Sequence, residues 1–441
     1  MPDHAVSDDP GVQAQLDRLA TLSPGADILG LDRVTRLLGR LGNPHRALPP
    51  IFHVAGTNGK GSTCAFLRAA LEADGRSVHV FTSPHLVRFN ERIRLQGKLI
   101  SDKALAAYLG RVLDVAEGIG ASFFEVTTAA AFLAFAEHPA DACILEVGLG
   151  GRLDATNVID NPVVCGIAQL GLDHQSFLGS TLKAIAAEKA GIAKPGAPLV
   201  TQRYPESLFP VMREAADRNG TQWLPMGKEW DAAAYRGRLH YRDDQGRLDT
   251  PLPRLPGAHQ VQNAALAFAM LRHQSAIPVS EAALKAAPLW AHWPARLQHL
   301  DHGPLLAPLP PETEAWLDGG HNAGAGEAIS AFFSADRLQG QKLTLVIGML
   351  ANKDVDAYLA PFAGRIAHIH ALPVPGHEHH SADRFAAIAA QWGIGCTAHA
   401  TPAEAIAAIA RKRHTKPPRL LIAGSLYLAG EILRLNDQYP D

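Results

Sequence analysis

The sequence predicts an α/β protein of two domains, each built around a mostly parallel sheet. Short, almost continuously apolar segments alternate with helical ones, as in sheets that helices cover on both faces. A polar, turn-rich stretch near residues 221–256 interrupts this alternation, which restarts near residue 298. A chain of 441 residues is long enough for two or three domains with separate cores.

The first domain, predicted to span residues 1–297, begins with a polar lead and a helical stretch. Strands are expected at residues 51–56, 78–84, 142–151 and 162–171. Helices are expected at 64–75, at 129–136 as a buried segment, and at 181–192, where Gly191 and Pro195 end the pattern. Residues 233–252 alternate around DDQG, which predicts a small antiparallel insert.

The second domain, predicted to span residues 298–441, repeats the α/β rhythm on a smaller scale. Strands are expected at residues 314–318, 342–350, 365–374 and 419–424, with helices at 382–393 and 402–413. The boundary is expected near Trp293–Gln298, and the domain is interpreted as a Rossmann-like α/β unit.

The charge balance excludes a general binder of nucleic acids or membrane surfaces, which needs a basic excess. Lys and Arg total 41 and Asp and Glu total 43, so the formal charge is −2. The four cysteines have no CxxC spacing, the N-terminus lacks a signal-peptide pattern, and no apolar run approaches the roughly 18 residues of a membrane span. We expect a cytoplasmic monomer that binds neither nucleic acid nor membrane.

A phosphate-binding loop is predicted at VAGTNGKGST, residues 54–63, between a strand and a helix. Glycines let backbone N–H groups approach phosphates, and Lys60 supplies a charge for the β- and γ-phosphates. Gly61 separates Lys60 from Ser62, which departs from the general GxxxxGK[ST] pattern. The alternative is a glycine-rich surface turn. Because the strand, the glycines, Lys60 and the helix agree, the first domain is interpreted as P-loop ATPase-like.

Several further segments resemble, in order, those of the folylpolyglutamate synthase/dihydrofolate synthase branch of the Mur-ligase superfamily. They are TSPHLVRFNERI (82–93), EVGLGGRLDATN (146–157), GLDHQSFLG (171–179), EKAGI (188–192), LPGAHQVQNAALA (255–267), ARLQ (295–298), LDGGHN (317–322), GMLANKD (348–354) and GSLYLAGEI (424–432). Gly320 stands where the family more often has Ala. The resemblance covers about residues 50–432 and implies the same fold and chemistry.

The resemblance implies ATP, Mg²⁺ and specific residues that bind them. The implied nucleotide contacts are Asn58, Gly59, Lys60, Gly61, Ser62, Asn263, Arg296 and Asp318. The implied metal ligands are Ser83, Glu146 and His174, although a histidine is an unusual ligand for Mg²⁺. Lys189 is implied to be carbamylated and to hold a second Mg²⁺, whereas most helical lysines are simply solvated.

The resemblance also implies the substrate-binding and catalytic residues. The implied substrate contacts are Ser122, Phe123, Phe124, Glu125, Leu153, Asp154, Ala155 and Ser425. The implied catalytic residues are Lys60, Lys189, Arg296 and His321. Simpler roles stay open: both phenylalanines as plain core, Ser83 as a turn residue, and Arg296 in an interdomain salt bridge.

The implied function is an ATP-dependent amide ligase that acts through an acyl phosphate. It would add L-glutamate to dihydropteroate, making dihydrofolate, and further glutamates to reduced folates. The alternatives are folylpolyglutamate synthesis alone or another Mur-type amino-acid ligase. A peptidoglycan Mur ligase carries a large domain ahead of the loop, whereas only about 50 residues precede it here. A non-catalytic nucleotide switch is the remaining class.

Overall fold

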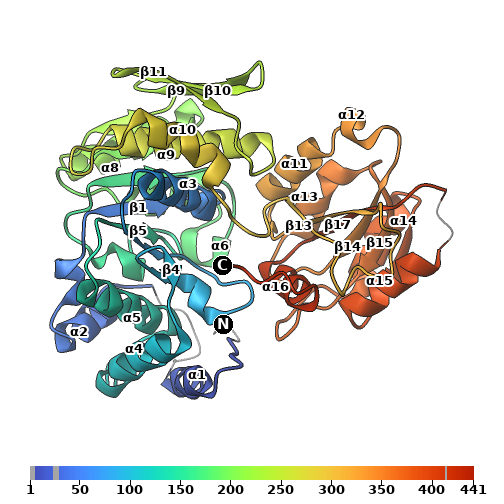
Figure 1. Ribbon diagram of the computed structural model, residues 1–441, viewed down its shortest axis with the longest axis horizontal. Helices are drawn as coiled ribbons and strands as arrows, with labels where there is room; N and C mark the ends of the chain where they lie inside the picture. Colours follow the sequence, from blue (N-terminus) through green and yellow to red (C-terminus); the bar gives the residue numbers. More distant parts are fainter. Residues whose placement is uncertain (1–4, 23–28, 413–414) are drawn as a thin grey trace. The chain divides into compact units, whose positions relative to one another are not determined.

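The computed structural model describes residues 5–22, 29–412 and 415–441. Contacts divide the chain into two compact units (Figure 1). Unit 1 contains Met1–Arg254, His259–His292 and Asp441, and unit 2 contains Leu255–Ala258 and Trp293–Pro440. Besides the short segment Leu255–Ala258, the chain enters unit 2 at Trp293, the first residue of the stretch Trp293–Gln298 in which the sequence placed the boundary.

The main sheet of unit 1 has the strand order β4-β3-β2-β5-β1-β6-β7-β8 in the described residues. These strands are β1 (Ile51–Ala55), β2 (Val78–Phe81), β3 (Ile93–Leu95), β4 (Lys98–Leu99), β5 (Ala142–Glu146), β6 (Val164–Ile167), β7 (Leu199–Thr201) and β8 (Trp223–Pro225). All neighbours from β2 to β8 pair in parallel, and β3 and β4 add an antiparallel edge. The predicted α/β fold with a mostly parallel sheet is confirmed.

Helices cover both faces of this sheet, which explains why its strands are almost continuously apolar. They are α1 (Pro10–Leu22), α2 (Asp32–Arg40), α3 (Lys60–Ala73), α4 (Asp102–Val115), α5 (Phe123–Glu137), α6 (Gln175–Leu178), α7 (Leu182–Ala190), α8 (Phe209–Arg218), α9 (Ala258–Arg272) and α10 (Glu281–Trp290). Leu145 of β5 packs with α5, and Cys165 of β6 packs with α7. On the opposite face, α9 places Met270 against Gly166 of β6.

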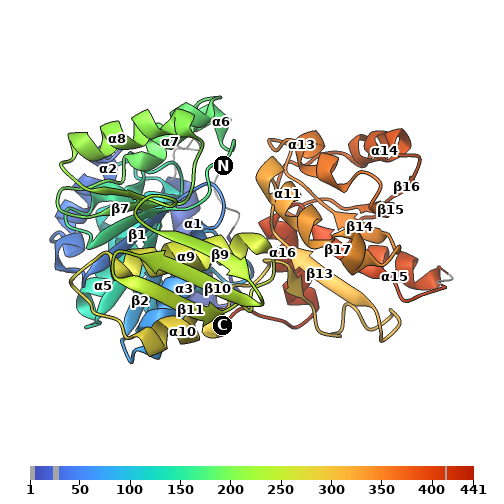
Figure 2. The same ribbon diagram turned by 90° about the horizontal axis from the view of Figure 1, so that it is seen from above.

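The predicted antiparallel insert is present, close to the residues from which it was predicted. Strands β9 (Asp231–Tyr235), β10 (Arg238–Asp243) and β11 (Gly246–Pro251) form a separate sheet, and the β10–β11 hairpin turns at DDQG (Figure 2). Trp223–Pro225, within the polar stretch noted near residues 221–256, pairs with β7 as the last strand of the main sheet.

The sheet of unit 2 has the order β12-β13-β17-β14-β15-β16 among the described residues. Its strands are β12 (Gln298–His299), β13 (Glu314–Asp318), β14 (Leu343–Ile347), β15 (Ile366–Ala371), β16 (Gly395–Ala398) and β17 (Arg419–Ala423). Its helices are α11 (Ala323–Phe332), α12 (Ala335–Leu338), α13 (Val355–Leu359), α14 (Ala382–Gln391), α15 (Pro402–Arg411) and α16 (Leu426–Leu435). The strands from β13 to β16 pair in parallel, as predicted for the second domain.

Most strands end earlier than the sequence suggested, as two strands of unit 1 show. The segments predicted at 78–84 and 142–151 stop at Phe81 and Glu146, because the residues beyond form loops at the carboxyl edge of the sheet. Gly150, in the second loop, has a φ of +70°, which a strand cannot accommodate. Across the described residues, no helix combines the length and apolarity that a membrane span requires.

Candidate active site

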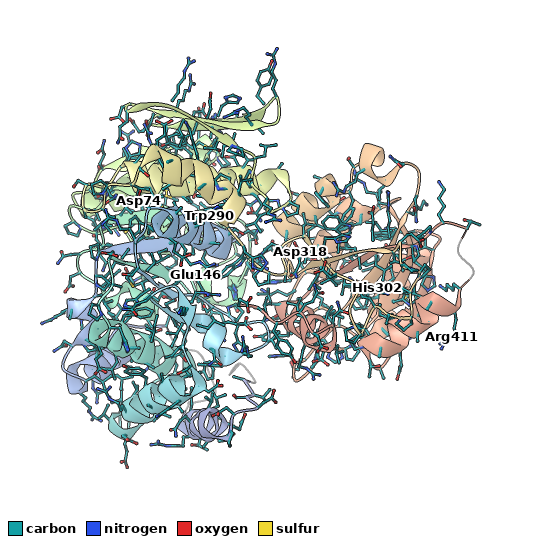
Figure 3. All side chains as sticks on the ribbon, viewed as in Figure 1. Asp74, Glu146, Trp290, His302, Asp318 and Arg411 are labelled. Carbon is teal, nitrogen blue, oxygen red and sulfur yellow. The ribbon has the colours of Figure 1, made fainter. Side chains whose placement is uncertain are left out.

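The predicted nucleotide and metal residues of unit 1 gather at one edge of the parallel sheet. Strands β2, β5, β1 and β6 are neighbours and run in the same direction. The loops after these strands carry Ser83, Glu146, the phosphate loop and His174; Figure 3 labels Glu146. The carboxyl edge of a doubly wound sheet is the usual place for a ligand.

The phosphate loop is held by the loop that follows β6. The Thr57 N–H donates to Gln169 O at 2.7 Å. Gly59 has a φ of +85°, in the left-handed region that favours glycine, and α3 begins at the next residue. The Lys60 ammonium lies 3.2 Å from Gly56 O, beside the N-terminus of α3. A cation and a helix N-terminus together suit a phosphate group.

The other predicted nucleotide residues of unit 1 surround this loop. The Asn58 amide donates to Gln169 Oε1 at 3.1 Å, while Gly61 and Ser62 lie buried in the first turn of α3. Asn263 of α9 lies against the loop, since a Cβ at residue 59 would be 2.3 Å from Asn263 Oδ1. The structure therefore brings residues from β1, α3 and α9 together, although they are some 200 positions apart in sequence.

Of the predicted metal ligands, Ser83 and Glu146 are directly connected. Glu146 is only 4% exposed, and its Oε2 accepts the Ser83 N–H at 3.3 Å. The buried Glu146 carboxylate, and the hydroxyl of the adjoining residue Ser83, are oxygen ligands of the kind that Mg²⁺ prefers. His174 begins α6 with a φ of +50°, and its Nε2 lies 4.0 Å from Asp173 Oδ1. His174 follows β6, on the same edge of the sheet.

Lys189 of α7 is buried beside the phosphate loop. It is 4% exposed, and its Nζ donates to Gly56 O at 2.9 Å. Burial, followed by the charge of Lys60, lowers the pKa of Lys189 to about 7, while Asp173 and Asp154 oppose this shift. The lowered pKa favours the neutral amine, which is the nucleophilic form, more than in an ordinary solvated lysine.

The predicted acceptor segment forms the start of α5. The Ser122 hydroxyl and the Glu125 carboxylate cap this helix reciprocally, and Arg33 pairs with Glu125 at 3.0 Å. Phe123 is 7% exposed and belongs to the core. Phe124 is half-buried and packs on the GLGG loop, because a Cβ on Gly148 would lie 2.4 Å from its ring.

Asp154 organises the GLGG loop from within. Its Oδ2 accepts the Leu149 N–H at 2.8 Å, and its Oδ1 accepts both the N–H and the hydroxyl of Thr156, at 3.0 and 2.5 Å. Burial raises the pKa of Asp154, and these hydrogen bonds lower it in part. Leu153 and Ala155 are the neighbours of Asp154 in the chain. The predicted segment therefore lies at this loop, and the Asp154 oxygens already accept backbone N–H groups.

The predicted residues of unit 2 lie around the carboxyl ends of β13 and β17, which are neighbours. Asp318 ends β13, and its oxygens accept the N–H groups of Leu297 and Gly320 at 2.8 and 2.7 Å. Arg296 NH1 donates to Ala295 O and lies near Gly319. His321 Nδ1 is 2.9 Å from Gly319 O, and Ser425 caps α16.

Sequence reasoning missed several polar residues that support this edge. The charge of Asp173 raises the pKa of Lys189. Gln202 and Gln260 each form a hydrogen bond with Asn263. Arg92 is 1% exposed and donates to His85 Nδ1 at 2.9 Å. Asp173 and Arg92 stand inside motifs that the sequence did single out. Gln202 follows β7 outside any such motif, so only the fold reveals its place.

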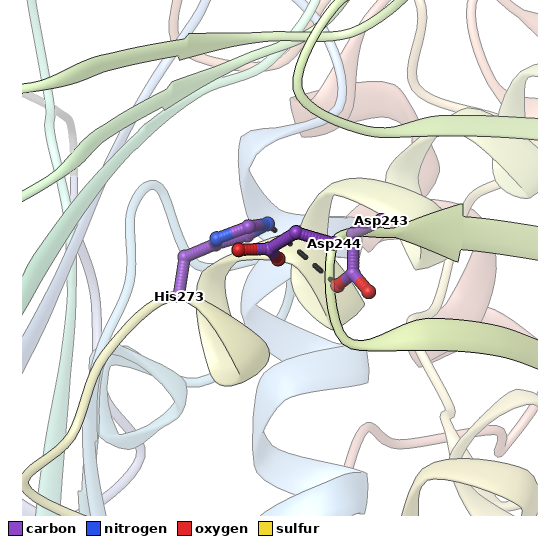
Figure 4. A group of neighbouring side chains, drawn as sticks. All are labelled: Asp243, Asp244 and His273. Carbon is purple, nitrogen blue, oxygen red and sulfur yellow. Dashed lines mark ion pairs between the residues drawn. The ribbon is translucent and has the colours of Figure 1, made fainter.

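A second group of possible metal ligands lies far from this edge in the chain. Among the described residues, Asp243, Asp244 and His273 are the one such group (Figure 4). The Asp243 carboxylate already accepts two 2.7 Å hydrogen bonds from Arg272 and one from Tyr241. A metal ion at this position would be repelled by the Arg272 guanidinium. Asp243 and Arg272 are therefore better explained as an ion pair that connects the β10–β11 hairpin to α9.

Comparisons with known proteins agree on one family. The family model for the C-terminal domain of dihydrofolate synthetase matches residues 309–435. The dihydrofolate synthase/folylpolyglutamate synthase of Bacillus subtilis is 36% identical over 339 residues, which are 74% of this chain and 76% of that protein.

Two solved structures extend the similarity to nearly the whole chain. Escherichia coli FolC in complex with DHPP and ADP has a TM-score of 0.85 and 32% identity, and the match covers 97% of both chains. The bifunctional enzyme of Yersinia pestis complexed with AMPPNP and Mn ion has a TM-score of 0.83 and 30% identity, covering 96% of this chain and 97% of that one.

Proposed function

This chain belongs to the dihydrofolate synthase/folylpolyglutamate synthase family, and we propose that it uses ATP to join L-glutamate to dihydropteroate and to reduced folates. The observation that carries the proposal is the carboxyl edge of the unit 1 sheet. There Lys60 and Lys189 both hydrogen-bond Gly56 O in the glycine-rich loop that precedes a helix, and Glu146 ends the strand next to β1. This arrangement suits a nucleoside triphosphate and a divalent cation.

The proposed reaction overcomes the poor reactivity of a carboxylate toward an amine. One carboxylate oxygen of the folate substrate bonds to the γ-phosphorus as the bond to ADP breaks. The neutral amine of glutamate then attacks the acyl carbon, loses a proton and displaces phosphate, which keeps that oxygen. Lys60 stabilises the negative charge on the transferred group and orients it.

Ser83, Glu146 and His174 are proposed to hold a divalent cation at this edge. The buried Glu146 carboxylate and the neighbouring Ser83 fit the oxygen preference of Mg²⁺. When bound, the cation supplies positive charge opposite the phosphate oxygens.

We propose further that Lys189 becomes a carbamate. The Lys189 ammonium first loses one proton; the neutral amine then attacks the carbon of CO₂ and loses a second proton, so a buried cation becomes an anion with two oxygens. The lowered pKa of Lys189 supports this step, because burial makes the first proton easier to lose. Such a carbamate would bind a second Mg²⁺.

The remaining assignments rest on the resemblance. Arg296 and Asp318 are proposed nucleotide contacts, and His321 and Ser425 are proposed glutamate contacts. Unit 1 is accordingly proposed as the ATP- and folate-binding domain and unit 2 as the glutamate-ligase domain. The protein is proposed to act as a cytoplasmic monomer.

One assay tests the proposed function. The enzyme is incubated with MgATP and labelled glutamate, with either dihydropteroate or a tetrahydrofolate as acceptor. We expect a labelled product with both. Product with the tetrahydrofolate alone would reduce the function to polyglutamylation, and product with neither would refute it.

A further inference from the structure

Three carboxamide side chains form a hydrogen-bonded row beside the phosphate loop. Gln202 follows β7, while Gln260 and Asn263 lie on α9, and all three are at most 7% exposed. Gln202 Nε2 donates to Asn263 Oδ1 at 3.2 Å, and Asn263 Nδ2 donates to Gln260 Oε1 at 3.1 Å. The row therefore has a direction, from Gln202 through Asn263 to Gln260.

This direction fixes which way the Asn263 amide faces. A carboxamide nitrogen only donates and a carboxamide oxygen only accepts, so turning the Asn263 amide alone by 180°, with both glutamine amides held, would oppose like groups at both ends. Gln260 keeps its oxygen toward Asn263 although its own buried Nε2 then has no hydrogen-bond partner in the described residues. Asn263 retains one N–H and one oxygen lone pair for a further partner.

The row also contacts the phosphate loop through Asn263. A Cβ at Gly59 would lie 2.3 Å from Asn263 Oδ1 and 3.2 Å from its Nδ2, so the amide rests directly on the loop backbone. Gly59 has a φ of +85° and precedes Lys60, the first residue of α3. A ligand whose phosphates sit on this loop would meet the amide in one defined orientation.

We propose that Gln202 and Gln260 are positioning residues that lock the Asn263 amide, and that this lock makes the site select an adenine nucleotide. The inference rests on the proposed function, in which Asn263 contacts ATP. An oriented asparagine amide suits the N6 amino donor and N7 acceptor of adenine. Hypoxanthine presents two acceptors along the same edge, so the fixed Asn263 oxygen would oppose its O6.

The test replaces the hydrogen-bond donor at residue 202 with an acceptor of the same size. Gln202→Glu replaces the donor that faces Asn263 Oδ1 with an acceptor, whereas Gln202→Met removes polarity at similar volume. We measure the Kd of ADP and IDP for the full chain by calorimetry, without folate or glutamate. The ADP preference over IDP should fall about tenfold in Gln202→Glu and about threefold in Gln202→Met, the size expected for one hydrogen bond.

A matched pair at the other end gives an independent readout. Gln260→Glu retains an acceptor for Asn263 Nδ2 and should keep most of the ADP preference, whereas Gln260→Leu removes that acceptor and should lower the preference about threefold, as in Gln202→Met. Equal weakening of ADP and IDP in all four variants would show that the row is only structural and would overturn the inference. Because binding is measured without ligation, a failure of the proposed ligase activity remains distinguishable from a failure of the lock.

Discussion

The carboxyl edges of the two sheets hold their buried polar groups in different ways. In unit 1, Lys189 is 4% exposed, and its burial beside a second ammonium lowers its pKa to about 7. In unit 2, Asp318 is equally buried, but its two oxygens accept the N–H groups of Leu297 and Gly320. One group is destabilised in its charged form, whereas the other is fully satisfied by backbone.

This difference shows that burial alone does not mark a reactive group. A carboxylate that accepts backbone hydrogen bonds shapes a loop, while an ammonium that burial disfavours is ready to react as a neutral amine. We therefore expect substitutions of the two ammonium groups near Gly56 O in unit 1, Lys60 and Lys189, to have the largest effect on the activating chemistry. Those in unit 2 should act on stability and binding.

The largest effect is expected for Lys60→Ala in the phosphate loop. Removal of the charge beside the transferred phosphate should lower the rate of phosphate release by about 1,000-fold, because positioned charges dominate phosphoryl transfer. Lys60→Arg, which keeps a cation, should retain more activity. A near-normal rate in Lys60→Ala would remove the loop from the reaction.

The next effect is expected for Lys189→Met, at about 100-fold in ligase rate. A pH experiment tests the cause. Since the folded pKa of about 7 lies below the ordinary value of 10.5, the unfolded chain binds more protons between these values. The free energy of unfolding should therefore rise with pH above about 7, and this rise should be smaller in the Met variant. Urea unfolding in CO₂-free buffer at several pH values measures it; identical slopes would contradict the assignment.

A smaller effect is expected in unit 2 for Asp318. Asp318→Ala leaves two buried N–H groups without their acceptor and should lower the free energy of unfolding by about 2 kcal/mol. Asp318→Asn keeps one oxygen acceptor and should cost about half as much. If both variants unfold like the wild type, Asp318 does not hold the loop as described.

The smallest effect is expected at the start of α5. Phe124, which packs on Gly148, should influence the acceptor, so Phe124→Leu should raise the KM for dihydropteroate about threefold and leave that for ATP unchanged. Phe123→Leu, in the core, should instead lower stability by about 1 kcal/mol. Equal KM values in wild type and Phe124→Leu would assign both rings to the core.

The sequence predicted much of the fold because buried strands have a strong local pattern. Residues 314–318 form β13 with the predicted limits, and the buried helix around 129–136 lies inside α5. Short or exposed strands were missed: β16 is largely exposed, β3 and β4 are short, and β7, although buried, has only three residues. An exposed strand needs no apolar face, so its residues carry little signal.

The candidate site was predictable only where a local motif exists. The phosphate loop shows its strand, glycines and lysine within ten residues. Lys189 has the pattern of a solvated helical lysine, and its hydrogen bond to Gly56 O joins positions 133 residues apart. Contacts at that separation follow from the sheet order, as does the link between Gln202 and Asn263.

The most direct test of the account is the fate of a carboxylate oxygen. Dihydropteroate with both carboxylate oxygens labelled by ¹⁸O is converted with ATP and glutamate, and the released phosphate is analysed by mass spectrometry. Activation through an acyl phosphate predicts one ¹⁸O atom in each phosphate formed together with an amide product. Amide formation with unlabelled phosphate would contradict the proposed chemistry at the carboxyl edge of unit 1.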